Sequence, residues 1–209
     1  MLGQKTESPQ RLWWLAAGVF ACLPIHAAGI YDQPEVECVG DYVVSSFIPT
    51  LGTLLTPIPE VTAPPKMVVI TDPVGLGNAT AELKKIEQHV PSERLVKLGT
   101  REEPANQEDV LSSLQSASIA HFACHGIQDA KNPLNSTLYL RKSQLEYLES
   151  KLEVSSLMRL SLQNSSLVFL SACETAMGGG ELPDESRHLA VTFLFCGFRG
   201  VVGTMWCVG

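Results

Sequence analysis

The sequence lacks the charge balance and the cysteine spacing that indicate nucleic acid or zinc binding. Acidic residues outnumber basic ones by 22 to 15, and the formal net charge is −7. Because nucleic acids attract basic patches, this balance disfavours them as partners. None of the six cysteines belongs to a Cys-x-x-Cys pair, and their spacing matches neither a zinc ribbon nor a disulfide scaffold. Such cysteine usage is typical of a reducing compartment, so we expect a cytoplasmic protein.

The glycine patterns of nucleotide-binding loops are also missing. Gly75-Leu76-Gly77 follows an expected strand, but it lacks the third glycine of a dinucleotide fingerprint and the Gly-Lys-Ser/Thr of a P-loop. We interpret this stretch as a turn. The sequence contains no internal repeat and no low-complexity segment. Its 209 residues, 45% of them hydrophobic, are enough to fold around one sizeable core.

What the sequence does contain is an alternation of short apolar runs with helical patterns. The runs are rich in strand-forming residues, and the segments between them carry apolar residues at helical spacing. This alternation predicts an α/β fold with a mostly parallel central sheet, right-handed crossovers and helices on both faces. Residues 11–30 are expected to form a strand, a turn at Pro24 and then an apolar helix or second strand. Further strands are expected over 42–47, 66–71, 94–98, 137–140 and 201–206, and helices over 51–55, 78–90, 104–115, 145–162 and 184–195.

Two apolar runs end in residues that carry chemistry. Residues 167–175 (LVFLSACET) pass from four apolar residues into Ser-Ala-Cys, and residues 119–126 (IAHFACHG) end at His-Gly. Both runs are expected to be strands buried on both faces. Open parallel sheets bind ligands at the carboxyl ends of their strands. Two neighbouring strands of this kind would bring His125 beside Cys173, a base beside a thiol.

The pair of His125 and Cys173 predicts a nucleophilic thiol. A free thiol is mostly protonated at neutral pH, and an imidazole within hydrogen-bond reach can take its proton. Gly126 has no side chain, so a substrate carbonyl can approach its N–H, which would form an oxyanion hole with the N–H of Cys173. Glu174 and Asp184 lie near the nucleophile in the sequence. They are candidates for selecting a basic substrate side chain, the alternative being solvated surface carboxylates.

Several other interpretations concern the same residues. His125 and Cys173 could be buried strand-end residues without a chemical role. His121, Cys124 and His125 form an H-x-x-C-H pattern, but adjacent strand residues point to opposite faces and no second pair has metal-ligand spacing. We therefore expect no metal, and we expect His121 and Cys124 to pack in the core. His188 is an alternative base at the polar start of a helix.

Several stretches together resemble the CHAT domain family. They are HFACHG, LVFLSACET and LPDESRHLAVTFLFCGFRGVVGTMW, supported by CLPIHAAGIYD, YVVSSFIPTLG and VVITDP. The resemblance is to the form common in large fungal proteins and covers nearly the whole chain. It implies a caspase-like fold, related to caspases and separases, and a cysteine endopeptidase with His125 as base and Cys173 as nucleophile. It also implies a protein or peptide substrate and no metal or organic cofactor.

The resemblance leaves a second function open. CHAT domains often follow tetratricopeptide repeats, so the alternative is a catalytically silent module that serves as a signalling or scaffold domain of a larger tetratricopeptide-repeat protein. Family members usually continue beyond the last expected strand, whereas this chain ends at Gly209, so we expect the C-terminal end of the domain to be incomplete.

The resemblance also bears on the N-terminal residues. Residues 1–11 are expected to be a loose segment and residues 12–209 to form the CHAT domain. The uncharged run over 12–30 has the outline of a signal or anchor segment. Because the resemblance includes this run, it implies that the run belongs to the core, and we do not expect the protein to lie in a membrane.

Overall fold

The chain folds into two compact units. Of the described residues, 8–55 belong to the first unit and those from 64 to 171 and from 188 to 204 belong to the second. The structure, a computed structural model, describes residues 8–55, 64–72, 76–100, 102–127, 129, 131–141, 149–171 and 188–204. Among these described residues, no helix combines the length and the apolar character that crossing a membrane requires.

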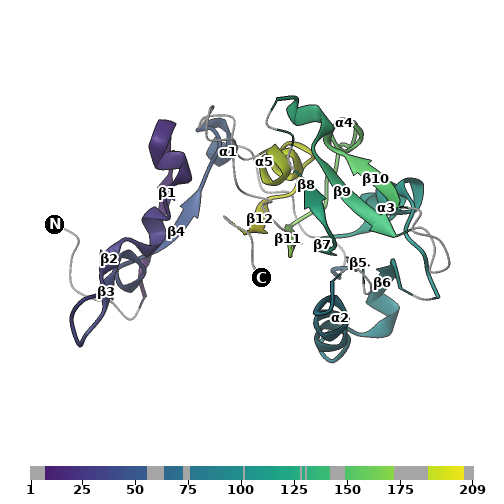
Figure 1. Cartoon of the computed structure of the whole chain (residues 1–209), viewed down its shortest axis with the longest axis horizontal. Helices are drawn as coiled ribbons and strands as arrows, with labels where there is room; N and C mark the ends of the chain where they lie inside the picture. The colour runs from purple at the N-terminus through teal and green to yellow at the C-terminus, as the bar shows by residue number, and fades with distance from the viewer. Residues whose placement is uncertain are drawn as a thin grey trace. The chain divides into compact units, whose positions relative to one another are not determined.

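The first unit contains two small sheets (Figure 1). β1 (Gln10–Trp14) pairs in parallel with β4 (Val43–Phe47), and β2 (Gly29–Ile30) pairs antiparallel with β3 (Glu37–Cys38). β4 confirms the strand expected over 42–47. The helix expected over 51–55 is confirmed by α1 (Gly52–Leu55).

The residues between β1 and β2 differ from the sequence expectation. β1 confirms the first strand, but short 3-10 helices and the two-residue β2 replace the expected apolar helix or second strand. Gly18 has a φ of +57, and Pro24 lacks the N–H that would continue a helix, so the chain is broken on both sides of the first 3-10 turn. The 3-10 helices of this unit are η1 (Gly18–Cys22), η2 (Ile25–Ala27) and η3 (Val39–Asp41).

The second unit contains a five-stranded sheet with the order β12-β11-β7-β5-β6 (Figure 1). Every pair of neighbours in it is parallel, which confirms the predicted parallel sheet. Each strand overlaps an apolar run that was expected to be a strand, and only β12 begins outside its run, by one residue. The strands are β5 (Met67–Thr71), β6 (Leu95–Leu98), β7 (Ile119–Ala123), β11 (Leu167–Leu170) and β12 (Gly200–Gly203).

Helices lie on both faces of this sheet. Phe122 of β7 packs against Phe193, with the two ring centroids 5.2 Å apart. The preceding residue, His121, points to the opposite face, where it contacts Glu82. Because side chains alternate along a strand, the helices that carry Phe193 and Glu82 cover opposite faces, which confirms the predicted architecture. The helices are α2 (Ala79–Glu87), α3 (Gln107–Ser116) and α5 (His188–Phe195), with the 3-10 turns η4 (Ser92–Arg94) and η5 (Pro133–Asn135).

The helix expected over 145–162 is wrong for the residues that the structure describes. Residues 149–153 form a strand, and only 154–157 form a helix, α4 (Val154–Leu157). Leu152 is buried while the neighbouring Lys151 is exposed, which is the alternation of a strand. The leucine spacing suits either structure, and the antiparallel pairing of this strand with residues 137–141 decides between them. The antiparallel second sheet has the order β10-β9-β8 and comprises β8 (Gly126–Ile127), β9 (Thr137–Arg141) and β10 (Glu149–Glu153).

β11 is buried on one face only, contrary to the expectation of burial on both. Val168 and Leu170 are fully buried, but Leu167 and Phe169 are 37% and 41% exposed. The neighbouring β7 follows the expectation, because four of its five side chains are buried. The difference arises because α2 packs on β5 and reaches β7, while the described residues leave this face of β11 partly uncovered.

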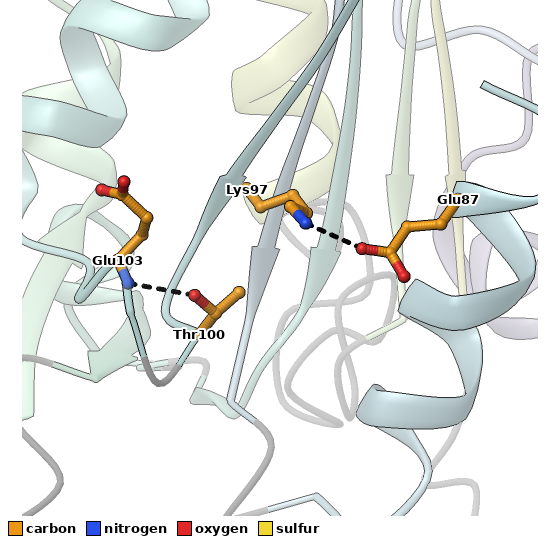
Figure 2. Close-up of polar contacts among 4 residues, drawn as sticks. All are labelled: Glu87, Lys97, Thr100 and Glu103. Atoms are coloured by element: carbon orange, nitrogen blue, oxygen red, sulfur yellow. Dashed lines mark hydrogen bonds and ion pairs between the residues drawn. The ribbon is translucent and has the colours of Figure 1, made fainter. Parts of the chain in front are cut away.

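Polar contacts fix α2 and the turn after β6 (Figure 2). The ammonium group of Lys97 lies 2.8 Å from Oε1 of Glu87 and joins β6 to α2. In the turn, the N–H of Glu103 donates to Oγ1 of Thr100 at 3.0 Å. Gly99 has a φ of +82, and a Cβ there would lie 1.9 Å from a carbonyl oxygen at the end of β5. Only glycine fits this close approach of two strand ends.

Candidate functional site

The carboxyl ends of β5, β7 and β11 lie side by side. The backbone hydrogen bonds continue one residue beyond β5 and β11, the two strands that flank β7. The N–H of Asp72 donates to the carbonyl of Ala123, and the N–H of Ser171 donates to that of Phe122, both at 2.8 Å. Phe122 also pairs in register with Leu170. The strand that leads to His-Gly and the strand that leads to Ala-Cys are therefore neighbours up to their ends, as the sequence predicts.

The second sheet holds the backbone of the His-Gly step. His125 is partly buried, and its carbonyl oxygen accepts a hydrogen bond from the N–H of Tyr139 at 2.8 Å. Gly126 begins β8 and pairs with Leu138 of β9. The chain thus passes from the parallel sheet into the antiparallel one at His125, and β9 fixes the backbone on both sides of that step.

The other predicted site residues lie outside the described ranges. Cys173, Glu174 and Asp184 all fall within residues 172–187. The last described residue before them is Ser171, two residues before Cys173. The structure therefore brings together the ends of the strands that lead to His125 and Cys173, and the roles of the predicted site residues stay predictions.

Cys124, beside His125 in the chain, is a core thiol. It is fully buried, which confirms the expected packing. Burial, with a smaller contribution from the Asp72 carboxylate, raises the pKa of this thiol well above its usual range. A thiol that stays protonated is a poor nucleophile and a poor metal ligand, so Cys124 cannot take the role proposed for Cys173. Within the described ranges, no group of three or more His, Cys, Asp or Glu side chains could hold a metal ion.

A sheltered ion pair lies at the same edge of the sheet. Nη1 of Arg141, the last residue of β9, lies 3.2 Å from Oδ1 of Asp72, and the two side chains are only 14% and 11% exposed. Removing one partner of such a pair leaves an uncompensated buried charge, so both residues are needed for stability. The pair joins β9, which holds the backbone of His125, to the end of β5.

Sequence reasoning missed a polar cluster on the α2 face of the sheet. Oε2 of Glu82 lies 2.9 Å from Nε2 of His121, and Oε1 of Glu82 accepts a hydrogen bond from Oγ of Ser171, also at 2.9 Å. We call these three residues the Glu82 cluster. His121 is buried, as expected, and its ring stacks on Phe169 with centroids 5.2 Å apart. In the sequence, His121 itself indicates such a cluster, because a polar side chain on a buried strand needs a hydrogen-bond partner.

The comparison with known families agrees with this arrangement. The CHAT domain matches residues 2–209. The chain belongs to the CHAT domain family. CHAT domains are caspase-like, and the parallel sheet with helices on both faces is consistent with that relationship. The family indicated by the His-Gly and Ala-Cys motifs is thereby confirmed. No curated protein matches the chain closely enough to count as a relative.

Proposed function

We propose that this CHAT domain is a cysteine endopeptidase that cleaves a protein or peptide substrate, with Cys173 as nucleophile and His125 as base. The pairing of β7 with β11 up to their ends carries the proposal. In the register that pairs Leu170 with Phe122, Ser171 lies level with Ala123, and these two residues come two residues before Cys173 and His125 respectively. The caspase-like family supports the same assignment.

The proposed reaction needs these side chains, backbone N–H groups and water. His125 takes the thiol proton of Cys173, and the sulfur attacks the carbonyl carbon of the peptide bond. The N–H groups of Gly126 and Cys173 bind the resulting oxyanion. When the C–N bond breaks, His125 gives its proton to the leaving amine and a thioester stays on the sulfur. Water, deprotonated by His125, then hydrolyses the thioester and restores the thiol.

A peptide that carries a thiol-reactive electrophile tests the proposal. Peptide mapping by mass spectrometry gives the labelling rate of each cysteine in the folded chain. We expect Cys173 to react at least about a hundredfold faster than Cys38, a partly exposed free thiol, and His125→Ala to lower the rate of Cys173 about a hundredfold. Cys173→Ser controls for labelling elsewhere in the chain.

The same experiment can reject the enzyme. If Cys173 reacts no faster than Cys38 and His125→Ala changes nothing, the endopeptidase proposal fails. That result would favour the alternative, a catalytically silent signalling or scaffold module.

Glu174 and Asp184 are proposed to favour a basic substrate side chain. Their position near Cys173 in the sequence supports this role, since a carboxylate beside the nucleophile attracts lysine or arginine. Glu174→Gln combined with Asp184→Asn should lower the labelling rate by a lysine-containing peptide about tenfold relative to an alanine-containing one. An unchanged ratio of the two rates would assign both carboxylates to the solvated surface.

A further inference from the structure

We propose that Glu82 is a positioning residue of this site. Its carboxylate holds the end of β11, through Ser171, level with the strand that leads to His125. The inference rests on the proposed function, because the residue that it positions is Cys173.

One carboxylate joins three elements of the fold. Oε2 of Glu82, on α2, lies 2.9 Å from Nε2 of His121 on β7. Oε1 accepts from Oγ of Ser171, directly after β11. The N–H of Ser171 also donates to the carbonyl of Phe122 at 2.8 Å. Ser171 is therefore held from two directions, by the sheet and by α2, and it is the last described residue before Cys173.

His121 makes this attachment rigid. Its ring is buried and stacks on Phe169 of β11, with the ring planes 14° apart. The Glu82 side chain, by contrast, is 35% exposed, and a long exposed side chain samples several rotamers. The bond to a buried, stacked imidazole selects one of them, so the carboxylate presents a fixed acceptor to Ser171.

Packing alone does not account for the Glu82 cluster. His121 pairs in register with Val69 of β5, a fully buried apolar residue on the same face of the sheet. A second β-branched residue at the position of His121 would suit such a surface. Buried polar groups cost free energy unless they are bonded, and replacing them by apolar residues is often neutral or stabilising. Polar residues on the two strands that lead to the proposed dyad are the exception expected at a functional site.

Four variants separate the parts of the cluster. Glu82→Leu removes both bonds, whereas Ser171→Ala removes only the bond to the end of β11. Glu82→Gln keeps an oxygen that can accept from Ser171 and an NH₂ that can donate to an unprotonated Nε2 of His121. Glu87→Leu is the matched control, because it makes the same change on the same helix at an exposed carboxylate that pairs with Lys97 (Figure 2).

The readout is the labelling of Cys173 by the peptide electrophile, separated into the maximal rate, kinact, and the half-saturating concentration, KI. A positioning role predicts that Glu82→Leu and Ser171→Ala each lower kinact about tenfold while KI stays within about twofold. The double variant should be no slower than Glu82→Leu alone, because Glu82 acts through Ser171. Glu82→Gln should recover most of kinact, and Glu87→Leu should leave it unchanged.

Thermal unfolding of every variant identifies chains that do not fold. An unchanged kinact in folded Glu82→Leu overturns the inference, and so do losses from Glu82→Leu and Ser171→Ala that multiply in the double variant. If Glu82→Leu does not fold, Ser171→Ala decides, and an unchanged kinact there overturns the inference. Slow labelling of Cys173 in the unchanged chain overturns the proposed function instead, and it is seen before any variant is made.

Discussion

The two faces of the five-stranded sheet are covered in different ways. On one face, Phe122 and Leu170 are fully buried, and α5 packs on Phe122. We call this the sealed face. On the other, the open face, the same two strands present His121, which is bonded to α2, and Phe169, which is 41% exposed. Leu170 and Phe169, which are neighbours on β11, therefore meet a dry apolar core on one side and a partly exposed surface on the other.

This difference assigns stability mainly to the sealed face and the proposed chemistry to the open face. Each large apolar side chain on the sealed face contributes about 1.5–3 kcal/mol by its burial, and together these side chains fix the strands. The open face carries the Glu82 cluster, with His121 in the middle of β7 and Ser171 directly after β11. Substitutions on the sealed face should lower the free energy of unfolding, whereas substitutions in the Glu82 cluster should lower the labelling rate of Cys173.

The largest effect is expected at Phe122. Phe122→Ala deletes a fully buried ring that packs on Phe193, and it should lower the free energy of unfolding by about 3–5 kcal/mol. Urea unfolding followed by circular dichroism measures the change. A loss below about 1 kcal/mol would show that this face is not sealed, and the comparison of the two faces would be wrong.

A somewhat smaller loss is expected in the turn after α5, the helix that covers the sealed face. Gly197 has a φ of +114, and a Cβ there would lie 2.0 Å from the carbonyl oxygen of Leu162. Gly197→Ala should cost about 2–3 kcal/mol through backbone strain and this clash. Gly77→Ala is the control, because a Cβ at Gly77 meets nothing within 4 Å. The control should change stability by less than about 1 kcal/mol, and equal losses at the two glycines would contradict the argument.

The thiols of the sealed face should make stability fall at alkaline pH. Burial raises the pKa of Cys196 to about 11, and it raises the pKa of Cys124 as well. Between about pH 9 and pH 11 the unfolded chain loses these protons while the folded chain keeps them, so the free energy of unfolding falls as the pH rises. Below this pH range the thiols stay protonated in both the folded and the unfolded chain, so they add no pH dependence to the free energy of unfolding.

The variant Cys196→Ala isolates the contribution of this thiol to the pH dependence of stability. Unfolding in urea at about pH 8 and about pH 10.5 should show a smaller fall for Cys196→Ala than for the unchanged chain. A fall of the same size in both chains would show that Cys196 is not sheltered as the structure has it.

The smallest loss of stability is expected on the open face. Phe169→Ala removes a ring that is already 41% exposed, and it should lower the free energy of unfolding by about 1 kcal/mol or less. The same urea titration provides the measurement, with Phe122→Ala as its reference. A loss as large as that of Phe122→Ala would show that both faces are sealed in solution and would remove the distinction between them.

The strands of the parallel sheet could be predicted because their signal is local. The runs MVVIT and IAHFA of β5 and β7 are almost wholly apolar, and their alternation with helical patterns indicates parallel pairing. Residues 149–157 could not be assigned in this way. Leu152 and Leu157 suit a helix as well as a strand followed by a turn, and the antiparallel pairing of β10 with β9 decides the outcome.

The Glu82 cluster could not be predicted because its members are far apart in the chain. Glu82 is 39 residues from His121 and 89 residues from Ser171. The sequence shows that His121 needs a partner, but only the packing of α2 on the sheet determines which carboxylate supplies it. The exposure of Phe169 depends on the same packing. Motifs alone pointed to His125 and Cys173. The structure adds that their strands are neighbours, and the contact between the two side chains stays a prediction.

The pH dependence of Cys173 labelling tests the central claim most directly, because it reports an imidazole beside the thiol. In the unchanged chain, we expect the labelling rate to reach half of its maximum at a pH well below about 8.5, which is the usual midpoint of a free thiol. In His125→Ala, we expect this midpoint to return to about pH 8.5. Superimposable profiles, both with a midpoint near that of a free thiol, would contradict it.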